Sequence, residues 1–94
     1  MMRRPDYTLL HEKLTSLVAQ LQDVLTESER GEVDEFIEVG EYGVALETVA
    51  AIIVEEGKRI SASQYSSIMQ LADMMGLGGS LAASGFNDAV KAEQ

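Results

Sequence analysis

The sequence predicts an all-α fold, a small bundle of four helices with short loops and a flexible C-terminal tail. Apolar residues recur at steps of three and four along most of the chain, which is the spacing of one helix face. Two capping-box sequences mark helix starts, and glycines follow the ends of three apolar segments. We therefore expect a helical domain over residues 1–77 and a flexible tail over residues 78–94.

The first helix is predicted over the stretch that follows Pro5 and ends near residue 25. Proline discourages extension upstream, because it cannot continue a helix on its N-terminal side. The apolar residues of this stretch lie three or four positions apart and should form the buried face: Leu10, Leu14, Leu17, Val18, Leu21 and Leu25.

The second helix is predicted to run from the capping box at Thr26 to Val39, with Gly40 as its stop. In a capping box, the threonine hydroxyl and the glutamate carboxylate three residues later, here Glu29, each satisfy a free backbone amide. The apolar stripe is narrow, so most of this helix should face solvent: Val33, Phe36 and Ile37.

The third helix is predicted between Glu41 and Glu56, and it is apolar on most sides. Helices of this kind are usually central in a bundle, because every side must be covered. One edge differs, since it carries only polar or small residues: Glu47, Ala51 and Glu55.

The fourth helix is predicted to begin at the capping box of Ser61 and Gln64 and to stop at Gly76. Its inward side chains should be Tyr65, Ile68, Met69, Leu71, Ala72 and Met75. From Gly78 onward, the glycine, serine and alanine content predicts a flexible tail with at most a short helix near Phe86 to Ala92.

Acidic residues are concentrated in the middle of the chain. The protein has 16 acidic and 7 basic residues and a net charge of −9. Ten of the acids and one base, Arg30, lie between residues 27 and 56, so the second and third helices carry the whole net charge. Such a field repels phosphate backbones and anionic lipids, so we expect neither nucleic acid nor a membrane as partner. Arg30 lies within reach of Glu27 or Asp34.

Two interpretations of these acids remain open. They could form a solvated face that keeps the protein soluble. Alternatively, they could form a docking surface for a basic partner, since clustered charge speeds association and selects the partner. On the second interpretation, the candidate partner-binding residues are four acids and one aromatic anchor: Asp34, Glu35, Glu38, Glu41 and Tyr42.

Residues that could carry catalysis are scarce. The chain has no cysteine and one histidine, His11, so thiolate nucleophiles and most metal sites are not expected. Adjacent carboxylates such as Glu55 and Glu56 point about 100° apart on a helix and do not converge on a substrate. The N-terminus has no signal-peptide pattern. The sequence thus predicts a cytoplasmic protein that is not an enzyme and that uses no cofactor and no metal.

The run from Val39 to Glu47, with Gly-Glu-Tyr-Gly at residues 40–43, resembles the MafI family of immunity proteins. The resemblance extends over Leu9 to Leu77 and includes three further short motifs: Glu55-Glu56-Gly57, Ile60-Ser61 and Met75-Gly76-Leu77. It implies a protein that protects the producing cell by binding the C-terminal domain of a cognate secreted toxin. Such toxin domains are often nucleases with basic clefts, which an acidic surface could occupy.

A different class of function also fits the sequence. The glycines of the Gly40 to Glu47 run can be explained by backbone conformation and close helix packing. The run could therefore serve the fold alone. The alternative function is a structural or adaptor helical bundle that mediates protein–protein contacts. Such a bundle could form a homodimer through an apolar patch around Met74 and Leu77. The sequence leaves the oligomeric state open.

Overall fold

The structure is a computed structural model in which residues 7–83 and 85–90 are described. It confirms the all-α bundle. Within the described residues, four helices of 12 to 14 residues form the bundle: α1 (Tyr7–Gln20), α2 (Glu27–Glu38), α3 (Tyr42–Glu55) and α4 (Ala62–Met74). Two shorter elements follow, the α-helix α5 (Gly78–Ala83) and the 3-10 helix η1 (Phe86–Ala89).

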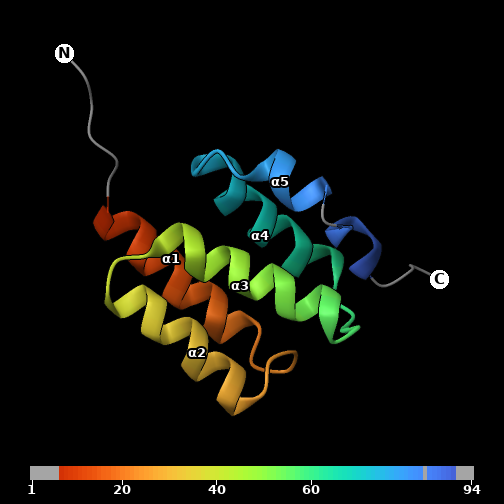
Figure 1. The fold of residues 1–94 in the computed structure, drawn as a ribbon, viewed down its shortest axis with the longest axis horizontal. Coiled ribbons are helices and arrows are strands. Elements are labelled where there is room, and N and C mark those ends of the chain that lie inside the picture. Colours follow the sequence, from red (N-terminus) through yellow and green to blue (C-terminus); the bar gives the residue numbers. More distant parts are fainter. Residues whose placement is uncertain (1–6, 84, 91–94) are drawn as a thin grey trace.

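Helix α3 is the central element, as its composition predicts. It contacts α1, α2, α4 and η1, and Figure 1 shows it between the α1–α2 pair and the α4–α5 pair. Five of its side chains are buried in the core: Ala45, Leu46, Val49, Ala50 and Ile53. Helices α1 and α2 run antiparallel beside it (Figure 1), which is the arrangement that a short connection favours.

The helix starts and stops follow local signals. Both predicted capping boxes are formed, Thr26 with Glu29 and Ser61 with Gln64. Helices α2, α3 and α4 end at glycines with positive φ, namely Gly40, Gly57 and Gly76. At Gly76, the amide of Leu77 donates to the Ala72 carbonyl at 2.7 Å, which is the long hydrogen bond of a Schellman motif. Only the backbone of glycine enters this conformation without strain.

Helix α1 is shorter than predicted. It ends at Gln20, and residues 21–24 form turns, although Leu21 and Leu25 are buried as the spacing predicted. In the turn, the amides of Val24 and Leu25 both donate to the Leu21 carbonyl, at 2.8 and 2.9 Å. The chain thereby reverses toward α2 while it keeps both leucines in the core.

Residues 78–90 differ from the expectation of a flexible tail. Leu81, Phe86 and Ala89 are buried, and the Phe86 ring is fully enclosed. The rings of Phe86 and Tyr65 stack with centroids 5.4 Å apart. Residues 78–90 therefore contribute side chains to the core that the sequence analysis did not place there. Burial of these three apolar side chains favours docking of the segment and opposes the entropy that is lost on ordering it. Residues 84 and 91–94 lie outside the described part of the chain.

Backbone contacts reinforce this docking. The Ile60 amide donates to the Ala89 carbonyl at 3.0 Å, and Ile60 and Val90 form an isolated parallel β-bridge. The C-terminal segment thus covers the end of α3 and the start of α4, where Ile60 is fully buried.

Candidate functional site

The five predicted partner-binding residues lie in two places. Asp34, Glu35 and Glu38 are exposed on α2. Glu41 and Tyr42 form the start of α3, where Glu41 is the N-cap residue and makes no capping hydrogen bond through its side chain. The four acids are exposed and Tyr42 is half-buried. Their role in binding stays a prediction.

Tyr42 is held by an aromatic cluster that the sequence did not indicate. Its ring centroid lies 6.1 Å from that of Tyr7 and 6.0 Å from that of His11, the latter in an edge-to-face arrangement. The Tyr42 hydroxyl lies 3.4 Å from His11 Nδ1. These contacts join residues 31 and 35 positions apart, which no local pattern reveals. They fix the start of α3 against α1, so one side of the Tyr42 ring is already occupied within the protein.

Tyr42 also lines a pocket of about 500 Å³ at the start of α3. The pocket brings together exposed apolar side chains from α1, α3 and α4, with exposed fractions of 59% for Tyr7, 39% for Val44 and 50% for Met74. Leu77 lies in the same lining. The patch proposed around Met74 and Leu77 and the predicted anchor Tyr42 are therefore parts of one surface.

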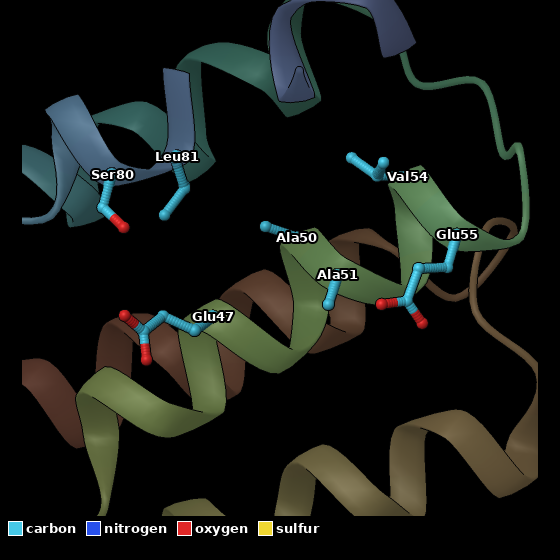
Figure 2. A pocket seen from close by; sticks show the side chains of 7 residues that line it. All are labelled: Glu47, Ala50, Ala51, Val54, Glu55, Ser80 and Leu81. Carbon is cyan, nitrogen blue, oxygen red and sulfur yellow. The ribbon is translucent and has the colours of Figure 1, made fainter. Parts of the chain in front are cut away.

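A second pocket of about 280 Å³ lies between α3 and α5. Figure 2 shows Ser80 and Leu81 projecting from α5 toward α3, with Glu47 and Glu55 at opposite ends of the pocket. Its lining on α3 is otherwise small or apolar: Ala50, Ala51 and Val54. Glu47 lines both pockets, so we treat them together as the α3 groove, which follows α3 from Glu41 to Glu55.

A third pocket, of about 480 Å³, continues past the end of α3. It shares Val54 with the second pocket, and its lining includes Lys58, Arg59 and Asp88. The charge along this side of α3 therefore changes from acidic to mixed where the helix ends.

The acids of the central stretch are exposed almost without exception. Of the ten acidic residues between 27 and 56, nine are exposed and Glu29 is half-buried. Across the described ranges, one ion pair is formed, between Lys58 Nζ and Glu29 Oε1 at 2.9 Å. The expected partnership of Arg30 with Glu27 or Asp34 is not formed, and Arg30 Nε is buried without a hydrogen-bond partner. The negative charge of α2 and α3 is thus largely uncompensated.

The pKa of Glu29 lies below its ordinary value of 4.5. The main cause is the hydrogen bond that its carboxylate accepts from the Thr26 backbone amide, at 2.9 Å. The second cause is the hydrogen bond from Lys58, whose ammonium group also donates to the Val24 carbonyl. Lys58 therefore joins the end of α3 to the start of α2.

Acidification is expected to remove the stabilisation that Glu29 contributes. Because the pKa is lower in the folded state, this contribution is fully present above about pH 4.5 and is lost as the pH falls through the folded-state pKa. We expect the difference in unfolding free energy between the wild type and Glu29→Gln to be larger at about pH 7 than at about pH 3. Urea unfolding at both pH values measures it. Lys58→Met is the control. It removes the ammonium group, which is the second cause of the lowered pKa, and keeps the hydrogen bond from the Thr26 backbone amide, which is the main cause. A difference that does not change with pH would contradict the lowered pKa.

The described residues offer no metal site and no membrane span. No group of three or more His, Cys, Asp or Glu side chains within them could hold a metal ion. None of the helices in the described part of the chain is both long and apolar enough to cross a bilayer.

No protein-family model matches this chain, and no curated protein or solved structure is significantly similar to it.

Proposed function

We propose that this protein is a cytoplasmic immunity protein, an antitoxin that binds and neutralises the C-terminal domain of a cognate secreted toxin. The observation that carries the proposal is the exposed and largely unpaired acidic surface of α2 and α3. The resemblance of the Gly40 to Glu47 run to the MafI family supports the same role.

A nuclease is the toxin class that fits this surface best. Its active cleft is basic because it must hold phosphate, and an acidic surface placed there would exclude the substrate. Retaining so many like charges on two adjacent helices costs stability through mutual repulsion. A basic partner would turn that repulsion into attraction on binding. Such an inhibitor acts by stoichiometric binding and needs no catalytic group.

Co-expression with the toxin encoded beside this protein is the primary test. Cells that make both proteins should grow, whereas cells that make the toxin alone should not. A toxin that kills equally in both cases would overturn the antitoxin role.

The acidic mechanism has a separate test in the double variant Glu35→Lys with Glu38→Lys. Both side chains are exposed, so the urea midpoint should change little. Affinity for the toxin domain should fall about tenfold or more, mainly through slower association, and its dependence on salt should weaken. The matched control is Glu12→Lys with Asp88→Lys, which makes the same charge change outside α2 and α3. Equal affinities for the two double variants would contradict a role for the α2 acids and would leave the antitoxin role standing.

The alternative, an adaptor bundle that forms a homodimer, is favoured by one observation. Met74 and Tyr7 are exposed by 50% and 59% in the pocket at the start of α3. Light scattering over a range of concentrations tests it, since a homodimer would show twice the monomer mass or a mass that rises toward that value with concentration. A mass that stays that of the monomer would count against this alternative.

A further inference from the structure

We infer that the α3 groove receives an amphipathic helix of the partner, one that carries small apolar residues and two lysine or arginine residues about two turns apart. The inference deepens the proposed function and rests on it for the existence of a partner. It adds to the contact of the α2 acids a second contact on the α5 side of α3, where none of the lining residues belongs to α2.

The spacing of the two glutamates on α3 sets the first requirement. Glu47 and Glu55 are eight residues apart and lie at opposite ends of the pocket in Figure 2. Eight residues of α-helix span about 12 Å and slightly more than two turns, so the two side chains lie about 80° apart on one broad side of the helix. Neither carboxylate forms an ion pair with another described residue. Two cations at the matching spacing on a second helix could therefore face both carboxylates at once.

The floor of the groove sets the second requirement. Between the two glutamates lies Ala51, which is exposed, beside the nearly buried Ala50. Alanine leaves room for another helix to approach closely, and close packing of small side chains supplies dispersion contacts over the whole length of the groove. The occupant should therefore carry alanine, glycine or serine opposite Ala51.

The neighbouring pocket at the start of α3 sets the third requirement. Val44, Met74 and Leu77 supply apolar lining, and Glu41 is also among the lining residues. Methionine adapts its shape to different side chains, so this pocket suits one large apolar residue of the occupant. Glu47 lies between the two pockets, and the large apolar residue should therefore stand one or two turns from the first cation.

The occupant is expected to be helical because α3 cannot pair with an extended strand. The backbone amides and carbonyls of α3 are engaged within the helix itself, so the groove offers an extended peptide no ladder of hydrogen bonds. A helix brings its own backbone hydrogen bonds and presents only side chains, which is the helix-in-groove mode of recognition.

A second copy of this chain is a poor occupant, because its own groove is rimmed by the same acids. Bringing Glu41, Glu47 and Glu55 of two copies together would place like charges opposite one another, which disfavours association. Charge complementarity instead selects a basic partner.

The test uses a synthetic helical peptide, which does not require the toxin. The probe is an alanine-rich peptide of about 18 residues with two lysines eight positions apart and one leucine about one turn from the first lysine, on the side away from the second. It is titrated into the ¹⁵N-labelled full chain. We expect the amide shifts to change at Ala51, Val54 and Ser80 and not on α2. A peptide with glutamate in place of both lysines should not bind.

Three variants make the result specific. Glu47→Lys with Glu55→Lys should weaken peptide binding about tenfold or more, whereas Glu35→Lys with Glu38→Lys makes the same charge change on α2 and should weaken it far less. Ala51→Gln places a longer neutral side chain on the groove floor and should also weaken binding about tenfold, without any change in charge. Each substituted side chain is exposed, so circular dichroism should show an unchanged fold.

The outcomes separate this inference from the proposed function. Equal weakening by the two charge-reversal variants, or shifts centred on α2, would overturn the groove as the docking site. So would full affinity of Glu47→Lys with Glu55→Lys for a toxin domain against which the wild type protects. If the peptide occupies the groove but the wild type fails to protect cells from the neighbouring toxin, the antitoxin proposal is overturned and the groove inference stands.

Discussion

Replacing Phe86 with alanine is expected to destabilise the protein by about 3–5 kcal/mol, the usual cost of removing a fully buried phenylalanine ring. The ring is completely enclosed and stacks on Tyr65, and it holds η1 against α3. A domain of this size has a total stability of about 5–14 kcal/mol, so the loss would be a large part of it. Urea unfolding followed by circular dichroism measures the change.

Asp88→Ala is the matched control, since Asp88 is exposed on the same short helix and should change stability by less than about 0.5 kcal/mol. A chain shortened to residues 1–77 should be less stable than Phe86→Ala, because it also removes Leu81 and Ala89 from the core. If Phe86→Ala unfolds at the same urea concentration as the wild type, residues 78–90 are not part of the cooperative core.

Replacing Gln64 with alanine is expected to cost about 2 kcal/mol, because it removes a capping interaction and the two hydrogen bonds that join the start of α4 to the end of α1. The Gln64 side chain is nearly buried and uses both ends of its amide. Its oxygen accepts from the Ser61 amide at 2.9 Å, and its nitrogen donates to the Gln20 carbonyl and to Asp23 Oδ1, both at 3.2 Å. One side chain thus serves the start of α4 and the end of α1.

Gln64→Glu separates these two roles. Glutamate suits a capping box as well as glutamine does, so the Ser61 contact should survive. The carboxylate cannot donate to Gln20, and it would lie beside the carboxylate of Asp23. We therefore expect Gln64→Glu to have a lower free energy of unfolding than the wild type at neutral pH. Glu29→Gln, in the other capping box, should lose only the stabilisation that the Glu29 charge contributes. A Gln64→Glu protein as stable as the wild type would show that the link to α1 contributes nothing.

The candidate site was predicted only in part. Charge counting located the acids of α2 and α3, and the structure shows that all of them except the half-buried Glu29 are exposed. The spacing of Glu47, Ala51 and Glu55 in the sequence predicted that they form one edge of α3. That α5 lies beside this edge and contributes Ser80 and Leu81 to a pocket could not be predicted, because the segment from Gly78 onward carries few local signals for structure. Phe86, a large apolar residue within it, was the one signal that could have indicated docking.

The sequence by itself determined the class of fold and the limits of most helices. Capping boxes, the glycine that ends each of three helices, and apolar spacing act within four or five residues, so they can be read from the order of residues alone. Only the tertiary structure decided which distant residues meet. Tyr42 with His11, Lys58 with Glu29, Gln64 with Gln20 and Phe86 with Tyr65 are each joined across 21 to 44 positions. Such contacts depend on how whole helices pack, and packing is a property of the assembled core that no short stretch of sequence contains.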